Sequence, residues 1–141
     1  EKQGFTNLTG VDYSAEAIQL AQLIKEKEKL ANIQLKVQDL LSPNISPNVY
    51  HITVDKGTYD AISLNPEDPA SKRKTYISNV HTMLKPDGLF IITSCNWTET
   101  ELLDHFSQYF QHIESISAPQ FSFGGKVGNT VTTLIMKKLP R

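Results

Sequence analysis

Residues 54–60 read Val54-Asp55-Lys56-Gly57-Thr58-Tyr59-Asp60, and this stretch decides the fold class. It leaves the end of an apolar run, Val49 to Val54, so two carboxylates, a lysine and an aromatic ring follow a predicted strand beside a glycine. Open α/β sheets build their sites at the carboxyl ends of their strands. A second polar and aromatic cluster, Ser94-Cys95-Asn96-Trp97-Thr98, follows a second apolar strand, Leu89 to Thr93. The two strand ends predict a shared crevice.

Strand-like and helix-like segments alternate along most of the chain. The expected strands cover residues 8–11, 33–37, 49–54, 89–93, 113–118 and 130–137. Three helices are expected. The first starts at Ser14 and ends in the Lys/Glu run 25–29, and the other two cover residues 70–84 and 99–110. This alternation predicts a largely parallel sheet with right-handed crossovers. The last two strands have no helix between them, so we expect them to form an antiparallel edge pair. Residues 85–88 are predicted to form a turn, and residues 121–128 a mobile loop on the substrate side.

Composition limits the class of protein. A chain of 141 residues is expected to form one domain. Its net charge of −1 gives no excess of positive charge for binding nucleic acid. No apolar run approaches the length of a membrane span, and the four histidines lack metal-ligand spacing. The single Cys95 fits a reducing compartment, so we expect the cytoplasm, with the nucleus as a second location.

Two aspartates close the first two predicted strands. In dinucleotide-type folds an acidic residue about 20 positions after a glycine-rich loop binds ribose hydroxyls, and Asp12 fits that role. The loop, its strand and its helix would then precede Glu1, in a chain that does not begin with Met. The alternative is that Asp12 only caps the next helix. Asp39 can accept a hydrogen bond from an adenine amino group while Leu40 gives apolar cover, but an Asp before a loop is common.

Four stretches carry a resemblance to a known family. They are Leu8-Thr9-Gly10-Val11-Asp12-Tyr13-Ser14, residues 54–62, Thr93-Ser94-Cys95-Asn96-Trp97-Thr98 and Phe121-Ser122-Phe123-Gly124-Gly125. The chain resembles, over essentially all its residues, the S-adenosylmethionine-dependent protein-lysine methyltransferases that modify elongation factor 1-alpha. The resemblance implies a Rossmann-like, seven-stranded class I methyltransferase fold of the α/β class. In this fold the first strand and helix, with the glycine-rich loop, would be missing from residues 1–141.

The resemblance also implies roles for individual residues. Asp12 would bind the ribose of the cofactor, Tyr13 would also contact the cofactor, and Asp39 and Leu40 would meet the adenine. Asp55 would lie near the methionine end of S-adenosylmethionine and the target lysine. The partner would be a protein, elongation factor 1-alpha, with no nucleic acid, membrane or metal.

The chemistry of methyl transfer to an amine asks mainly for positioning. The acceptor lysine must lose a proton, and a nearby carboxylate raises the pKa of an amine, so Asp55 and Asp60 are expected to orient the amine rather than act as strong bases. Tyr59 and Trp97 could wall the lysine channel, with core packing as the alternative for both. Lys56 is either a solvated charge or a partner of these aspartates. Two other functions stay open: a non-catalytic interaction module and a small-molecule methyltransferase.

Overall fold

The computed structural model describes residues 1–117, 122–124, 126–127 and 131–141. Its chain divides into two compact units, residues 1–42 and residues 43–141, and each is described by itself.

The first unit is a strand, a helix and a second strand, as the sequence predicts. Strand β1 (Leu8–Asp12) pairs in parallel with β2 (Ile33–Val37), and helix α1 (Ala15–Lys27) connects them. The helix begins where expected, because the hydroxyl of Ser14 accepts a hydrogen bond from the backbone N–H of Ala17 at 3.2 Å. The carboxyl ends of β1 and β2 therefore lie side by side.

The second unit contains a four-stranded sheet in the order β3-β4-β8-β5. Its strands are β3 (Tyr50–Lys56), β4 (Leu84–Ser94), β8 (Thr132–Lys138) and β5 (Phe110–Ser117). Strands β3 and β4 are parallel, whereas β8 is antiparallel to both β4 and β5. The predicted antiparallel final pair is thus confirmed, and β5 forms the edge of the sheet.

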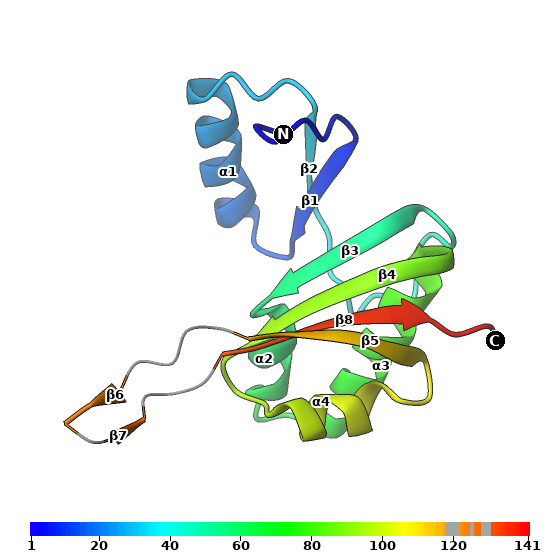
Figure 1. Cartoon of the computed structure of the whole chain (residues 1–141). Helices are drawn as coiled ribbons and strands as arrows, with labels where there is room; N and C mark the ends of the chain where they lie inside the picture. Colours follow the sequence, from blue (N-terminus) through cyan, green and yellow to red (C-terminus); the bar gives the residue numbers. More distant parts are fainter. Residues whose placement is uncertain (118–121, 125, 128–130) are drawn as a thin grey trace. The chain divides into compact units, whose positions relative to one another are not determined.

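Three helices pack on one face of this sheet (Figure 1): α2 (Thr58–Ser63), α3 (Pro69–Met83) and α4 (Glu99–Phe106). Alternate residues of β4 and β8 point into the core beneath them, among them Phe90, Ile92 and Leu134, each at most 1% exposed. The parallel strands β3 and β4 end beside the start of α2, and this is the end of the sheet where the candidate site lies.

Three local predictions need correction. The helix expected over residues 99–110 ends at Phe106, and Phe110 is already the first residue of β5. Residues 85–88 do not precede β4 but form an irregularity inside it, because the pairing moves from Tyr50 with Leu84 to Ile52 with Leu89. Part of the predicted loop 121–128 is a two-stranded antiparallel hairpin, β6 (Ser122–Phe123) with β7 (Lys126–Val127), while residues 121, 125 and 128 lie outside the described residues.

Candidate active site

Asp55 joins the carboxyl end of β3 to the first turn of α2. Its carboxylate accepts hydrogen bonds from the backbone N–H groups of Thr58 (2.8 Å) and Tyr59 (3.0 Å), and from the hydroxyl of Tyr76 on α3. These N–H groups have no partner within the helix, so Asp55 satisfies the start of α2 in place of the usual N-cap side chain. The cap position itself is Gly57, whose φ of 96° suits glycine.

Asp55 is 4% exposed, and its protonation reflects that burial. Burial raises the pKa of its carboxyl, and the hydrogen bonds from Tyr76, Thr58 and Tyr59 oppose the rise. Burial likewise raises the pKa of the Tyr76 hydroxyl, and the neighbouring Asp55 charge adds to the rise. The structure therefore keeps Tyr76 as a neutral donor to Asp55.

Asp60 links α2 to the segment that follows β4. Its carboxylate accepts hydrogen bonds from the Ser94 hydroxyl (2.5 Å) and from the Cys95 N–H (2.9 Å). Ser94 is fully buried, and its oxygen accepts the N–H groups of Asn96 (3.1 Å) and Trp97 (3.0 Å). The Asp60 carboxylate and the Ser94 hydroxyl thus set the path of residues 94–97 at the carboxyl end of β4.

The half-buried Trp97 is held on several sides. Its indole N–H donates to the Ser63 hydroxyl at 3.2 Å, and its ring meets His105 edge to face with centroids 4.7 Å apart. The guanidinium of Arg73 lies over the indole, 5.3 Å from the ring centroid. Thr132 of β8 donates to the Trp97 carbonyl at 3.0 Å. A cation therefore already occupies one face of the ring that the sequence assigns to a lysine channel.

Tyr59 lies in the core rather than on a surface. It is 1% exposed and packs against Tyr76 and Phe106, with ring centroids 5.6 Å and 5.1 Å apart. Its hydroxyl and Nδ1 of His105 are 2.9 Å apart. Of the two interpretations of Tyr59, the structure favours core packing. Lys56 is exposed, and within the described residues no ion pair joins it to an aspartate, which favours a solvated charge.

Four of the five predicted cofactor residues lie together in the first unit, whereas Asp55 lies in the second. Asp12 ends β1 opposite Val37, and the Asp12 carbonyl accepts the Gln38 N–H at 2.8 Å, so Asp12 and Asp39 share one end of the two-stranded sheet. Oδ1 of Asp12 accepts the Ser14 N–H at 2.9 Å. The alternative that Asp12 caps the helix start is thus also realised, through one oxygen. Asp39 likewise accepts the Leu41 N–H at 2.8 Å. The neighbouring Tyr13 is 78% exposed, and Leu40 is half-buried.

The site in the second unit includes side chains that sequence reasoning missed. They are Ser63, Arg73, Tyr76 and His105. Tyr76 was expected on the apolar face of its helix, which is correct, but its hydrogen bond to Asp55 spans 21 positions and has no local signal. The predicted convergence of Asp12 and Asp39 with Asp55 and Trp97 stays a prediction.

Two other kinds of site are absent from the part of the chain that the structure describes. Its side chains include no group of three or more His, Cys, Asp or Glu residues arranged to hold a metal ion. None of its helices is long and apolar enough to cross a membrane.

Comparison with known proteins shows similarity to methyltransferases. Residues 1–138 match the family model described as a methyltransferase domain. The chain is 53% identical over 137 residues to EEF1A lysine methyltransferase 2 of Mus musculus, which covers 97% of the chain and 56% of the mouse protein. It is 38% identical to the protein-lysine N-methyltransferase EFM4 of Saccharomyces cerevisiae, covering 93% of the chain and 59% of the yeast protein. It therefore spans little more than half the length of these curated relatives.

A solved structure agrees in fold. The N-methyltransferase NodS from Bradyrhizobium japonicum, in complex with S-adenosylhomocysteine, superposes with a TM-score of 0.68 at 18% identity, over 96% of this chain and 67% of NodS. The predicted methyltransferase fold of the α/β class is thus confirmed. By the match over residues 1–138 and by its fold, the chain belongs to the methyltransferase-domain family.

Proposed function

We propose that this chain is part of an S-adenosylmethionine-dependent protein-lysine N-methyltransferase whose substrate is elongation factor 1-alpha. The observation that carries the proposal is its 53% identity, over 97% of the chain, to a protein named EEF1A lysine methyltransferase 2. The relatives in yeast and fission yeast are also named protein-lysine methyltransferases. The single Cys95 fits a protein of the cytoplasm, where we place its activity.

The residues of the first unit fit a nucleoside cofactor. Asp12 uses only Oδ1 for the start of α1, and within the described residues its Oδ2 has no hydrogen-bond partner. That oxygen can accept hydrogen bonds from ribose hydroxyls. The exposed Tyr13 ring and the half-buried Leu40 supply apolar surface next to the two aspartates. When bound, S-adenosylmethionine supplies a methyl group on a positively charged sulfur, which is already electrophilic.

The second unit holds in place the residues that we assign to the acceptor lysine. Asp55 is buried and receives three hydrogen bonds, so we assign it to holding the start of α2 in place rather than to taking a proton from lysine. Asp60 fixes residues 94–97 through Ser94. Trp97 then forms one wall for the acceptor. Methyl transfer is sensitive to the position of the amine, so a fixed wall favours the neutral amine in line with the methyl group.

The proposal is tested with purified protein that includes any residues its gene encodes before Glu1. It is incubated with S-adenosylmethionine and unmethylated elongation factor 1-alpha, and intact-protein mass spectrometry follows the substrate. We expect an added mass of one or more methyl groups, located by peptide mapping to lysine. Methylation of small amines alone would instead favour a small-molecule enzyme, and binding of the elongation factor without methylation would favour an interaction module.

A further inference from the structure

Arg73 stands out in the second unit because no acidic partner among the described residues neutralises its positive charge. It lies half-buried on α3 with its guanidinium over Trp97, and within that part of the chain it takes part in none of the ion pairs. A guanidinium that lies over an aromatic ring can turn the edge that carries its N–H groups to a planar carboxylate. Such an edge is suited to bidentate recognition of an acidic side chain.

Three of the four carboxylates whose charge acts on Tyr59 or His105 beside Arg73 are committed to other groups, and the fourth, the exposed Asp104, forms no ion pair with Arg73 among the described residues. Asp60 binds Ser94 and the Cys95 N–H, and Asp55 binds the start of α2. Glu101 closes a capping box with Thr98, whose N–H and hydroxyl both donate to it at 2.9 Å. None of these three carboxylates can turn to Arg73 without giving up its own hydrogen bonds.

His105, the other side chain next to Trp97, does not neutralise the positive charge of Arg73 either. His105 packs against Trp97, and its burial together with the Arg73 charge lowers the pKa of its imidazole, against the opposing charges of Asp104 and Glu101. The ring is therefore neutral near pH 7. Arg73 also lowers the pKa of the Tyr59 hydroxyl, against the larger rise caused by burial. The guanidinium is thus the one net charge of the cluster formed by Arg73, Trp97 and His105.

This cluster lies at the carboxyl end of the parallel pair β3 and β4. Trp97 is three residues beyond the end of β4, and Ser63, which holds its indole, closes the helix that follows β3. Open α/β sheets bind their ligands at this end. An acceptor bound at Trp97 would lie near the guanidinium of Arg73, which is 5.3 Å from the centroid of the indole.

We propose that Arg73, which lies over the ring of Trp97, binds an acidic side chain next to the target lysine, so that the enzyme selects lysines in an acidic sequence. The inference rests on the proposed function, and it adds a substrate class. The same positive charge repels a lysine ammonium, which favours the neutral amine that accepts the methyl group. The acidic neighbour, rather than the lysine, is the group that Arg73 holds.

The test is a cycle of two changes, one in the protein and one in the ligand. Two peptides are used, a lysine flanked by glutamates and the same peptide with glutamines. Their dissociation constants are measured by the fluorescence of Trp97, the sole tryptophan, and by calorimetry. We expect wild type to prefer the glutamate peptide about fivefold, the size of an exposed or half-exposed ion pair. Arg73→Gln removes that preference.

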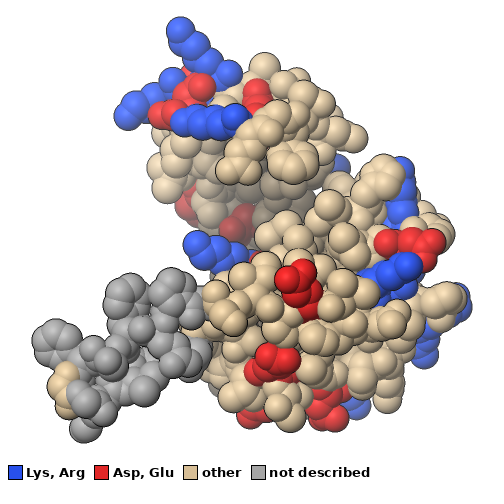
Figure 2. Space-filling view, in the orientation of Figure 1, with Lys and Arg blue, Asp and Glu red and all other residues tan. Residues whose placement is uncertain are grey.

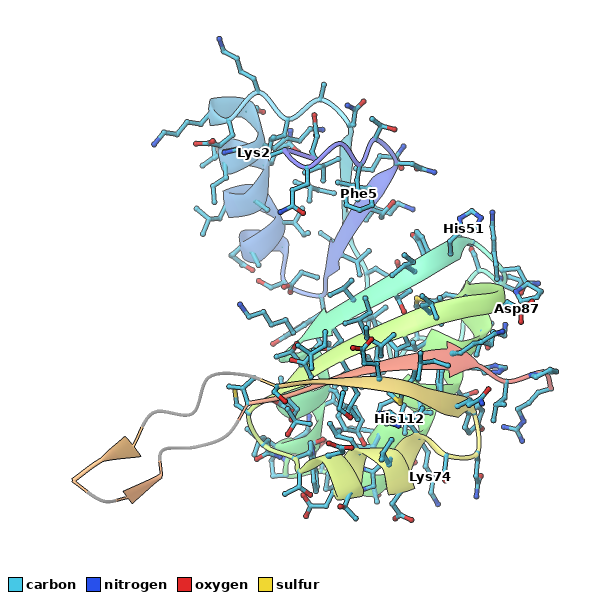
Figure 3. All side chains as sticks on the ribbon, in the orientation of Figure 1. Lys2, Phe5, His51, Lys74, Asp87 and His112 are labelled. Carbon is cyan, nitrogen blue, oxygen red and sulfur yellow. The ribbon has the colours of Figure 1, made fainter. Side chains whose placement is uncertain are left out.

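The matched control is Lys74→Gln. Lys74 is an exposed cation on the same helix, next in sequence to Arg73, and is labelled in Figure 3. Its loss removes the same charge and should leave the preference intact. Equal preference in wild type and Arg73→Gln would overturn the inference, as would an equal loss in both variants.

Two further measurements distinguish an ion pair with the peptide from a contact between Arg73 and the cofactor. The preference of wild type should fall as salt is raised, which needs no variant, and a preference that salt does not change would contradict an ion pair. If Arg73→Gln instead weakens the binding of S-adenosylhomocysteine and leaves the preference for the glutamate peptide unchanged, the carboxylate that Arg73 binds is that of the cofactor. The inference is then wrong. Binding is read without turnover, so wild type that selects the glutamate peptide but methylates nothing would refute the proposed function alone.

Discussion

Replacing Asp55 by alanine should destabilise the protein far more than its position at the edge of a site suggests. The change leaves the N–H groups of Thr58 and Tyr59 without an acceptor at the start of α2, which costs about 1 kcal/mol as a lost cap. It also leaves the hydroxyl of Tyr76, 1% exposed, without its partner, which costs roughly 1–3 kcal/mol. We therefore expect a loss of roughly 2–4 kcal/mol in the free energy of unfolding.

The assay is urea unfolding, followed by the fluorescence of Trp97 and by circular dichroism. Asp104→Ala is the control, because Asp104 is an exposed carboxylate on α4, and its loss should change stability by no more than about 0.5 kcal/mol. Tyr76→Phe removes one of the three donors, so Asp55→Ala should cost less in that background, by about 1 kcal/mol. A loss below about 1 kcal/mol for Asp55→Ala alone would refute the assignment of Asp55 to the start of α2.

Three further perturbations follow from the same structure. Asp60→Asn should loosen the segment that carries Trp97, seen as stronger acrylamide quenching of its fluorescence; unchanged quenching would show that Asp60 does not position it. Burial lowers the pKa of His81 below its value in the unfolded chain, so the unfolded state binds more protons below about pH 6.5 and the protein loses stability as the pH falls. His81→Gln should therefore flatten the dependence of the melting temperature on pH, and an unaltered slope would disprove this. Gly57→Ala meets no atom within 4 Å, so its cost should be backbone strain alone, about 1–2 kcal/mol at a φ of 96°, and an unchanged melting temperature would argue against it.

The longer elements were predictable because their signals are local. Ser14 caps α1 as its side chain predicts, and strand β4 is apolar on both faces where the prediction placed a central strand. The positions of Asp12 and Asp39 were also predictable from the ends of their strands, because parallel neighbouring strands end at the same edge of the sheet. The alternation of strands and helices was enough for the fold class.

The short helix α2 was not predicted. It has six residues, too few to show an apolar repeat, and its cap is a glycine with no side chain to announce it. The group that satisfies its first turn, Asp55, comes from the preceding strand, and the hydrogen bond from Tyr76 exists only once α3 has packed on the sheet. For the same reason the sequence suggested Tyr59 for a channel wall as readily as for the core.

The surface of the second unit carries exposed apolar side chains. Figure 2 shows uncharged side chains over most of the face of residues 43–141 that it draws, between scattered charged ones. Ile52 and Val54 on β3 are 49% and 71% exposed. Apolar residues on an exposed strand favour association, so the unfolding experiments call for low protein concentration.

The central claim, that this chain binds S-adenosylmethionine through Asp12, is tested most directly by calorimetry with S-adenosylhomocysteine. Wild type is compared with Asp12→Asn, which keeps the oxygen that accepts the Ser14 N–H and loses only the charge. The account predicts binding by wild type and a loss of roughly 1.5–3 kcal/mol, or about ten- to a hundredfold in affinity, in the variant. Equal affinity of the two proteins, or no binding by wild type that includes any residues encoded before Glu1, would contradict it.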